Sequence, residues 1–168
     1  MNNARTLLAL DASSTRTGWA FFIDGKYASS GVIDYTSKEA KKLSSDKRIK
    51  EMCISIFETI NTFHPDSIAI EKMTVSRNMT TVRVLSKIIG TVFAYAIQCD
   101  INYYEIEASQ WRAALHMQKR GRKRDEYKKL SVQYAQKIAG KDITDDEADA
   151  ICIGESFWKK ELNVYVGN

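Results

Sequence analysis

The sequence of 168 residues contains few histidines and cysteines. Its two histidines, His64 and His116, stand far apart in the chain, which argues against acid–base catalysis by histidine. Its three cysteines, Cys53, Cys99 and Cys152, are widely spaced within apolar patterns and form no Cys-x-x-Cys motif. We therefore interpret them as buried, reduced thiols of a cytosolic protein.

Long apolar runs are also absent. No run approaches the ~18 residues that a membrane span needs, and the N-terminal "MNNARTLLAL" lacks the pattern of a secretory signal. No P-loop occurs, because neither "DGKY" nor "AGKD" has the required upstream glycine or a hydroxyl residue after the lysine. We therefore expect a cytoplasmic protein that uses no membrane and no nucleotide cofactor. The length, with 44% hydrophobic and 27% charged residues, fits one globular domain over residues 1–168.

Positive charge is concentrated in one segment. The net charge is only +4, but residues 119–129, "KRGRKRDEYKK", hold seven basic and two acidic residues. Such a segment favours a phosphate-rich partner, although a solvated surface loop is the open alternative. The candidate contacts to nucleic acid are Lys72, Lys119, Arg120, Arg122, Lys123 and Arg124.

The order of predicted elements indicates an α/β fold. Strands are expected at 6–10, 19–24, 26–33, 67–71 and 101–107, and helices at 49–63, 80–97, 108–116, 124–139 and from 144 onward. Asp24-Gly25 predicts a hairpin turn, and "TDDE" at Thr144 fits a capping box. Residues 34–46 are expected to form a surface loop. We predict a five-stranded mixed sheet flanked by helices, with the first three strands antiparallel and the later strands parallel to the first.

Carboxylates fall at the ends of these elements. In "LLALDASSTRTGWAFF", Asp11 ends the first strand, and Glu71 ends the fourth. Parallel neighbouring strands would bring both to one edge of the sheet, where ligands collect. In "TDDEADAICIG", Asp149 lies three residues after Asp146 and four after Asp145, so either pair shares a helix face. The alternative is that each of these acidic residues simply lies at an exposed end of a strand or helix. Converging carboxylates are typical ligands of Mg²⁺ or Mn²⁺, two of which form the apparatus for phosphodiester displacement.

Three motifs in this order give the chain a resemblance to a known family. "LALDASSTRTGWA", "SIAIEKM" and "DDEADAICIG" resemble the RuvC family of Holliday-junction resolvases, of the RNase H-like nuclease superfamily, and are most similar to its phage-encoded members. The resemblance implies that two ions, Mg²⁺ or Mn²⁺ as substitute, are held by Asp11, Glu71, Asp146 and Asp149, which would be the catalytic residues. It selects Asp146 over Asp145 because the family spaces its last two aspartates by three.

The resemblance also implies a substrate and an assembly. It predicts a homodimer that cuts two opposed strands of a four-way junction or other branched DNA and leaves 5′-phosphate nicks, in the host cytoplasm if the chain is phage-encoded. Arg77 and Asn78 match a further family feature, "RN", and join the candidate DNA contacts. Bacterial members carry an aromatic residue where this chain has Thr74, and Met73 and Met79 are the candidates to replace it as an apolar wedge.

Other functions remain open on the sequence. "DASSTRTG" also resembles the phosphate loop of actin-like ATPases, but 168 residues cannot hold their two duplicated domains, and Ala12 stands where they have glycine. A nuclease of the same fold that acts on RNA–DNA hybrids or in transposition is an alternative. A catalytically inactive module that binds branched DNA is another, but four intact carboxylates argue against it.

Overall fold

The structure, a computed structural model, describes residues 5–73 and 78–165, with side chains described as far as residue 160. It contains five strands and six helices in these described ranges. The strands are β1 (Thr6–Asp11), β2 (Arg16–Ile23), β3 (Lys26–Asp34), β4 (Ser67–Glu71) and β5 (Asn102–Ile106). The helices are α1 (Lys38–Lys41), α2 (Ser45–Phe63), α3 (Met79–Gln98), α4 (Ala108–Ala114), α5 (Arg124–Ala139) and α6 (Asp145–Tyr165).

The strands form one mixed sheet in the order β3-β2-β1-β4-β5. β1 and β2 pair antiparallel, as do β2 and β3, whereas β4 runs parallel to β1 and β5 parallel to β4. The β2–β3 turn at Asp24-Gly25 has positive φ at both residues, as the hairpin sequence predicts. The predicted class, strand directions and hairpin are therefore confirmed.

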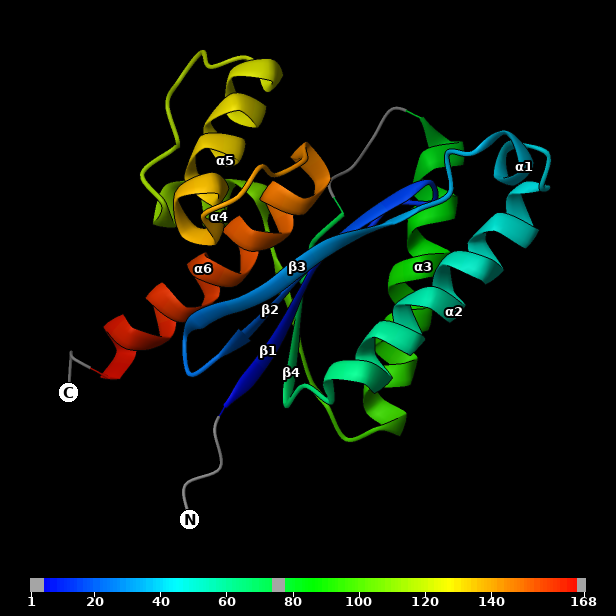
Figure 1. Ribbon diagram of the computed structural model, residues 1–168, viewed down its shortest axis with the longest axis horizontal. Helices are drawn as coiled ribbons and strands as arrows, with labels where there is room; N and C mark the ends of the chain where they lie inside the picture. Colours follow the sequence, from blue (N-terminus) through cyan, green and yellow to red (C-terminus); the bar gives the residue numbers. More distant parts are fainter. Residues whose placement is uncertain (1–4, 74–77, 166–168) are drawn as a thin grey trace.

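Helices cover both faces of the sheet: α2 and α3 lie on one face, and α4, α5 and α6 on the other (Figure 1). The central strand β1 is buried on both sides, so its side chains alternate between two cores. Leu7 and Ala9 belong to the core with α6, and Leu8 and Leu10 to the core with α2 and α3. This two-sided burial explains why the first strand reads as an unbroken apolar run.

Helix α6 packs closely against the sheet because two positions lack side chains. A Cβ at Gly18 on β2 would collide with the backbone carbonyl of Asp146, and one at Gly154 on α6 would collide with the ring of Phe22. Gly18 pairs with Asp11 across the β1–β2 ladder. The start of α6 therefore lies directly beside the end of β1.

Several predicted boundaries differ from the structure. β2 begins at Arg16 instead of residue 19, and α2 begins at Ser45 because Ser44 caps it, with its hydroxyl accepting from the backbone N–H of Lys47. The expected loop at 34–46 contains the short helix α1, which Ser37 caps in the same way. Short capped helices carry too few apolar residues to show a periodic pattern. Cys99 is exposed, not buried, because it follows the last residue of α3.

Helix α3 leaves much of its apolar surface uncovered. It is long and apolar enough to cross a membrane by length and composition, with a mean hydropathy of 1.3, and only 17% of that window is buried. No continuous apolar run of this length occurs in the sequence because Arg83 and Lys87 interrupt it. Phe93 and Ile97 on its outer surface are 47% and 63% exposed.

Candidate active site

Asp11 and Glu71 meet at one edge of the sheet. Each is the last residue of its strand, and the preceding residues, Leu10 and Ile70, are paired in the parallel β1–β4 ladder. The two carboxylates therefore emerge side by side at the carboxyl ends of neighbouring strands, as the sequence predicts.

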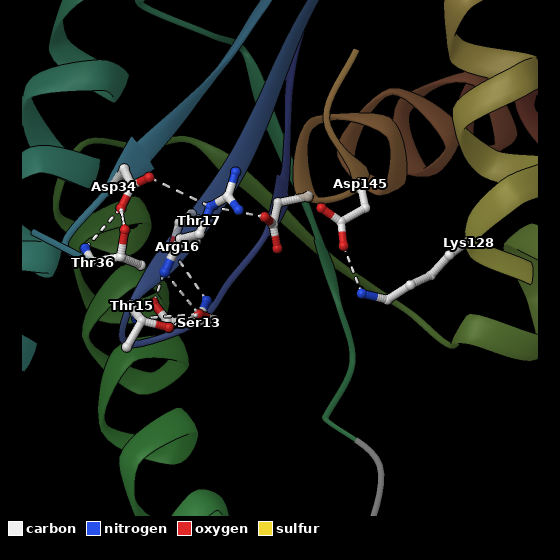
Figure 2. Close-up of polar contacts among 9 residues, drawn as sticks. Ser13, Thr15, Arg16, Thr17, Asp34, Thr36, Lys128 and Asp145 are labelled. Carbon is white, nitrogen blue, oxygen red and sulfur yellow. Dashed lines mark hydrogen bonds and ion pairs between the residues drawn. The ribbon is translucent and has the colours of Figure 1, made fainter. Parts of the chain in front are cut away.

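The first turns of α6 add two more carboxylates. Asp149 lines a cavity of about 540 Å³ with Asp11 and Glu71, and Asp146 lines an adjoining cavity of about 540 Å³ with the same two residues. Asp145 instead forms an ion pair with Lys128 of α5, in which Nζ of Lys128 lies 2.6 Å from Oδ2 of Asp145 (Figure 2). The structure thus brings together the four predicted carboxylates and directs Asp145 to another partner.

Arg16 is the counter-ion of Asp146 in this structure. Its Nε lies 3.1 Å from Oδ2 of Asp146 and 3.6 Å from Oδ2 of Asp34, so it bridges the first turn of α6 and the end of β3 (Figure 2). The loop before it is fixed by Ser13, whose hydroxyl accepts hydrogen bonds from the backbone N–H groups of Thr15 and Arg16. Sequence reasoning missed Arg16, because its partners lie more than a hundred residues apart in the chain.

The grouped carboxylates disturb one another's ionisation. Burial raises the pKa of Asp11 well above its ordinary value, and the charges of Glu71, Asp149 and Asp146 raise it further. Burial likewise raises the pKa of Asp149 to about 6, with a further contribution from Glu71 and an opposing hydrogen bond from Ser131. Burial raises the pKa of Asp146, whereas Arg16 opposes this rise. Crowded carboxylates with raised pKa values mark a site that a cation would stabilise.

The donor chemistry of this group fits a hard divalent cation, because all four side chains are carboxylates. In the described ranges, no three Asp, Glu, His or Cys side chains lie close enough together to hold one ion. Two of the carboxylates are engaged elsewhere, since Asp146 pairs with Arg16 and Glu71 accepts a hydrogen bond from Trp111. The side chains are therefore gathered at one site but not closed around a common point.

Helix α4 contributes two residues that sequence reasoning did not assign to the site. Trp111 was expected in the core, and it is fully buried, but its indole Nε1 also donates to Oε2 of Glu71 at 2.8 Å. The guanidinium of Arg112 lies 4.8 Å from the ring centre of Trp111 and 4.7 Å from that of Tyr127. Arg112, Tyr127 and Lys128 line the cavity that contains Asp149. The sequence feature that could have pointed to these two residues is a basic residue directly after a tryptophan on a short helix.

The basic segment divides into residues with different surroundings. Arg124 is the first residue of α5 and lines both cavities. Arg122 donates to the carbonyl of Met117 and lies over the ring of Tyr127, and the backbone N–H of Lys123 donates to Glu126 in the cap of α5. Lys119 and Arg120 are exposed. Within this segment, Arg124 lines both cavities, and Tyr127 and Lys128 line the cavity that contains Asp149.

Of the other predicted DNA contacts, Lys72 follows the strand-end glutamate and Asn78 directly precedes α3. Lys72 forms an exposed ion pair with Glu107, at 3.2 Å from Nζ to Oε1. Asn78 caps α3, its side-chain oxygen accepting from the backbone N–H groups of Thr80 and Thr81. Arg77 and Thr74 lie outside the described residues. Of the two possible apolar wedges, Met79 is 60% exposed, whereas Met73 is half-buried and contacts Ser86.

Comparison with known proteins gives a consistent family. The family model "Crossover junction endodeoxyribonuclease RuvC" matches residues 7–155. The protein of that name from Alkaliphilus metalliredigens is 29% identical over 123 residues, covering 73% of this chain and 74% of the relative. The one from Halothermothrix orenii is 26% identical over 154 residues, covering 90% and 93%.

Solved structures share the fold at lower identity. T. thermophilus RuvC in complex with a Holliday junction substrate superimposes with a TM-score of 0.73 at 16% identity, covering 94% of this chain and 95% of that one. The Fowlpox virus resolvase, also in complex with Holliday junction DNA, gives a TM-score of 0.62 at 16% identity, covering 94% and 98%. Because the family model spans the sheet, α4, α5 and the carboxylate-bearing start of α6, this chain belongs to the RuvC family of crossover junction endodeoxyribonucleases.

Proposed function

We propose that this chain is a structure-selective DNA endonuclease that resolves four-way junctions by paired phosphodiester hydrolysis, leaving 5′-phosphate nicks. The observation that carries the proposal is the gathering of Asp11, Glu71, Asp146 and Asp149 around two adjoining cavities in a chain of the RuvC family. These four residues are the proposed catalytic and metal-binding residues.

The proposed cofactor is Mg²⁺, with Mn²⁺ as substitute and two ions in each site. Held by these four carboxylates, such ions would supply activation of the attacking water and stabilisation of the leaving 3′-oxygen. The chain's own part is to supply oxygen ligands from the rigid ends of β1 and β4 and from α6. Glu71 is oriented by Trp111, and Asp146 has Arg16 as its counter-ion until a cation competes for it.

Basic side chains around the carboxylates are the proposed contacts to the DNA backbone. Arg124 and Arg112 line the cavities and are the proposed contacts nearest the cleaved bond. Lys72, Arg77, Asn78, Lys119, Arg120 and Lys123 are proposed as outlying contacts that add affinity without reading sequence. Arg122 is proposed mainly to hold the segment in place, because its guanidinium is already bonded to Met117 and stacked on Tyr127.

The proposed active unit is a homodimer located in the cytoplasm. Two symmetric cuts require two sites related by a two-fold axis. The uncovered face of α3 supports this assembly, because Phe93 and Ile97 are exposed and a Cβ at Gly90 would meet no atom within 4 Å. Ser86, Gly90 and Ala94 follow one another at intervals of four, which lets a second helix approach closely.

Cleavage of synthetic DNA tests the proposed function. A four-way junction should be cut symmetrically with Mg²⁺ or Mn²⁺ and not in excess EDTA, and Ca²⁺ should support binding alone. A flap, a linear duplex and an RNA–DNA hybrid of matched sequence should be cut far more slowly. Faster cleavage of the hybrid would favour the alternative nuclease function, and tight junction binding without cleavage under every metal would favour an inactive binding module.

A further inference from the structure

The cavity lined by Asp146 contains a basic residue that the proposed function does not use. Arg48 of α2 lines this cavity of about 540 Å³, together with the hydroxyl residues Ser14, Thr80 and Thr81. These residues come from the loop after β1, from α2 and from the start of α3. Three separate segments therefore bring one guanidinium and several hydroxyl groups to the edge of the carboxylate group.

Arg48 has no counter-ion in the described part of the chain. Its Nε is buried and has no hydrogen-bond partner there. Asp46 pairs with Lys87 at 2.7 Å and Asp146 pairs with Arg16 at 3.1 Å; Asp11 and Glu71 also line the cavity, but no ion pair joins either of them to Arg48 among the described residues. A buried donor without a protein partner is unfavourable, so a ligand or a water molecule that offers an acceptor at this point would be stabilised.

The surrounding groups suit an anion with several oxygen atoms. Thr80 and Thr81 line the cavity, and their backbone N–H groups already donate to the side chain of Asn78, which leaves their hydroxyl groups as the donors that they can offer to a ligand. A guanidinium presents a planar fork of donors that matches phosphate, and hydroxyl side chains are common phosphate partners. The composition of this wall therefore favours a phosphate group.

The position of the cavity indicates which phosphate it would take. It shares Asp11, Glu71 and Arg124 with the cavity that holds Asp149 and Arg112. A DNA strand whose reacting phosphate lies at the shared carboxylates would extend into both cavities. We propose that Arg48, with Ser14, Thr80 and Thr81, forms a seat for a backbone phosphate next to the cleaved one. This proposal rests on the proposed function. It adds contacts from the loop after β1, from α2 and from the start of α3 to the basic residues of α4 and α5.

The test compares Arg48→Gln with Lys50→Gln. Both variants lose one positive charge from α2, but Lys50 is exposed and lines neither cavity. Binding of a synthetic four-way junction is measured in Ca²⁺ over a range of salt concentrations. Arg48→Gln should weaken binding by about tenfold and flatten the slope of log affinity against log salt by about 0.9, whereas Lys50→Gln should leave the slope unchanged. Arg48→Lys should keep the slope while losing affinity, because it retains the charge without the fork.

A chemical change in the DNA locates the contact. Single neutral methylphosphonate linkages are placed in turn around the cleavage site, and each is bound to wild type and to Arg48→Gln. At one position beside the cleaved bond, the two losses should be non-additive, since each removes the same contact. Additive losses at every position would overturn the proposal, as would a changed melting temperature with an unchanged salt slope.

The outcome for the seat is separable from that for the proposed function. Wild-type cleavage of the junction tests the function and does not involve the Arg48 variant. If the wild type cut no junction, the same salt series on a linear duplex would still compare Arg48→Gln with Lys50→Gln. Equal slopes for both variants there would overturn the seat.

Discussion

The indole Nε1 of Trp111 donates a 2.8 Å hydrogen bond to Oε2 of Glu71 from a side chain with no exposed surface. The bond joins α4 to the end of β4 and fixes the rotation of a proposed metal ligand. Partners that orient metal ligands from outside the coordination sphere commonly change metal affinity by about 10- to 100-fold. Trp111 is therefore a positioning residue for Glu71.

Trp111→Phe keeps most of the buried ring but removes the donor. We expect cleavage to slow by about tenfold and Mn²⁺ affinity, measured by titration without DNA, to fall by about tenfold. Junction affinity in Ca²⁺ should hold, because no phosphate contact is lost. Trp158→Phe is the matched control, since Trp158 is also buried but packs against the Gly25 turn. If both variants lose the same Mn²⁺ affinity, Trp111 has only a packing role.

The two adjacent aspartates at the start of α6 should behave differently. Asp146→Asn and Asp149→Asn should each abolish cleavage and keep junction binding, because each removes a proposed ligand and relieves repulsion among carboxylates. Asp145→Asn should reduce cleavage less than threefold, because Asp145 pairs with Lys128 instead. Single-turnover cleavage and binding assays check this. An essential Asp145 with a dispensable Asp146 would contradict the proposed ligand set.

Without metal, the buried and crowded carboxylates should lower the stability of the folded protein. The raised pKa of Asp149, about 6 against an ordinary 3.8, means that folding favours its protonated form. Asp149 therefore contributes to the free energy of unfolding below pH 3.8. This contribution, up to ~3 kcal/mol, is lost as the pH rises through about 6. In EDTA at pH 7.5, Asp149→Asn should therefore be more stable than wild type, and this advantage should disappear near pH 4.

Urea denaturation at several pH values measures this difference. Asp142→Asn is the control, because Asp142 is exposed in the loop before α6. Saturating Mg²⁺ should reverse the order by stabilising the wild type. Equal stability of wild type and Asp149→Asn in EDTA across this pH range would show that neither burial nor the charge of Glu71 raises the pKa of Asp149 in the folded protein.

Arginines of the basic segment should separate into two classes. Arg124→Gln should slow cleavage and flatten the salt slope of junction binding by about 0.9, because Arg124 lines both cavities. Arg122→Gln should lower the melting temperature, since it loses the bond to Met117 and the stacking on Tyr127. Melting curves and salt titrations distinguish them. If Arg122→Gln flattened the salt slope by about 0.9 and Arg124→Gln left it unchanged, the two roles would be reversed.

The exposed face of α3 should control assembly. Ile97→Asp and Phe93→Asp should yield monomers in sedimentation experiments, with little loss of folding stability, because both side chains are substantially exposed. The monomers should nick junctions on one strand instead of making paired cuts. Ile54→Asp on α2 is the control, since Ile54 is also exposed. A monomeric wild type, both free and bound to a junction, would reject the homodimer.

Much of the sheet edge was determined by the sequence alone. An apolar run followed by Asp11, and another followed by Glu71, predict parallel buried strands that end in carboxylates, because chain direction and strand period decide where such residues emerge. The Asp24-Gly25 turn is equally local, so a short stretch of sequence specifies it.

Only the tertiary structure decided which side chains meet. Helical spacing allows both Asp145 and Asp146 to share a face with Asp149, and the close packing of α6 against Gly18 separates them, directing one to Lys128 and the other to Arg16. The bond from Trp111 to Glu71 and the placement of Arg48 likewise join segments far apart in the chain. Periodicity describes one element at a time, whereas these contacts depend on how two elements pack, which is set by side-chain volumes in the two cores.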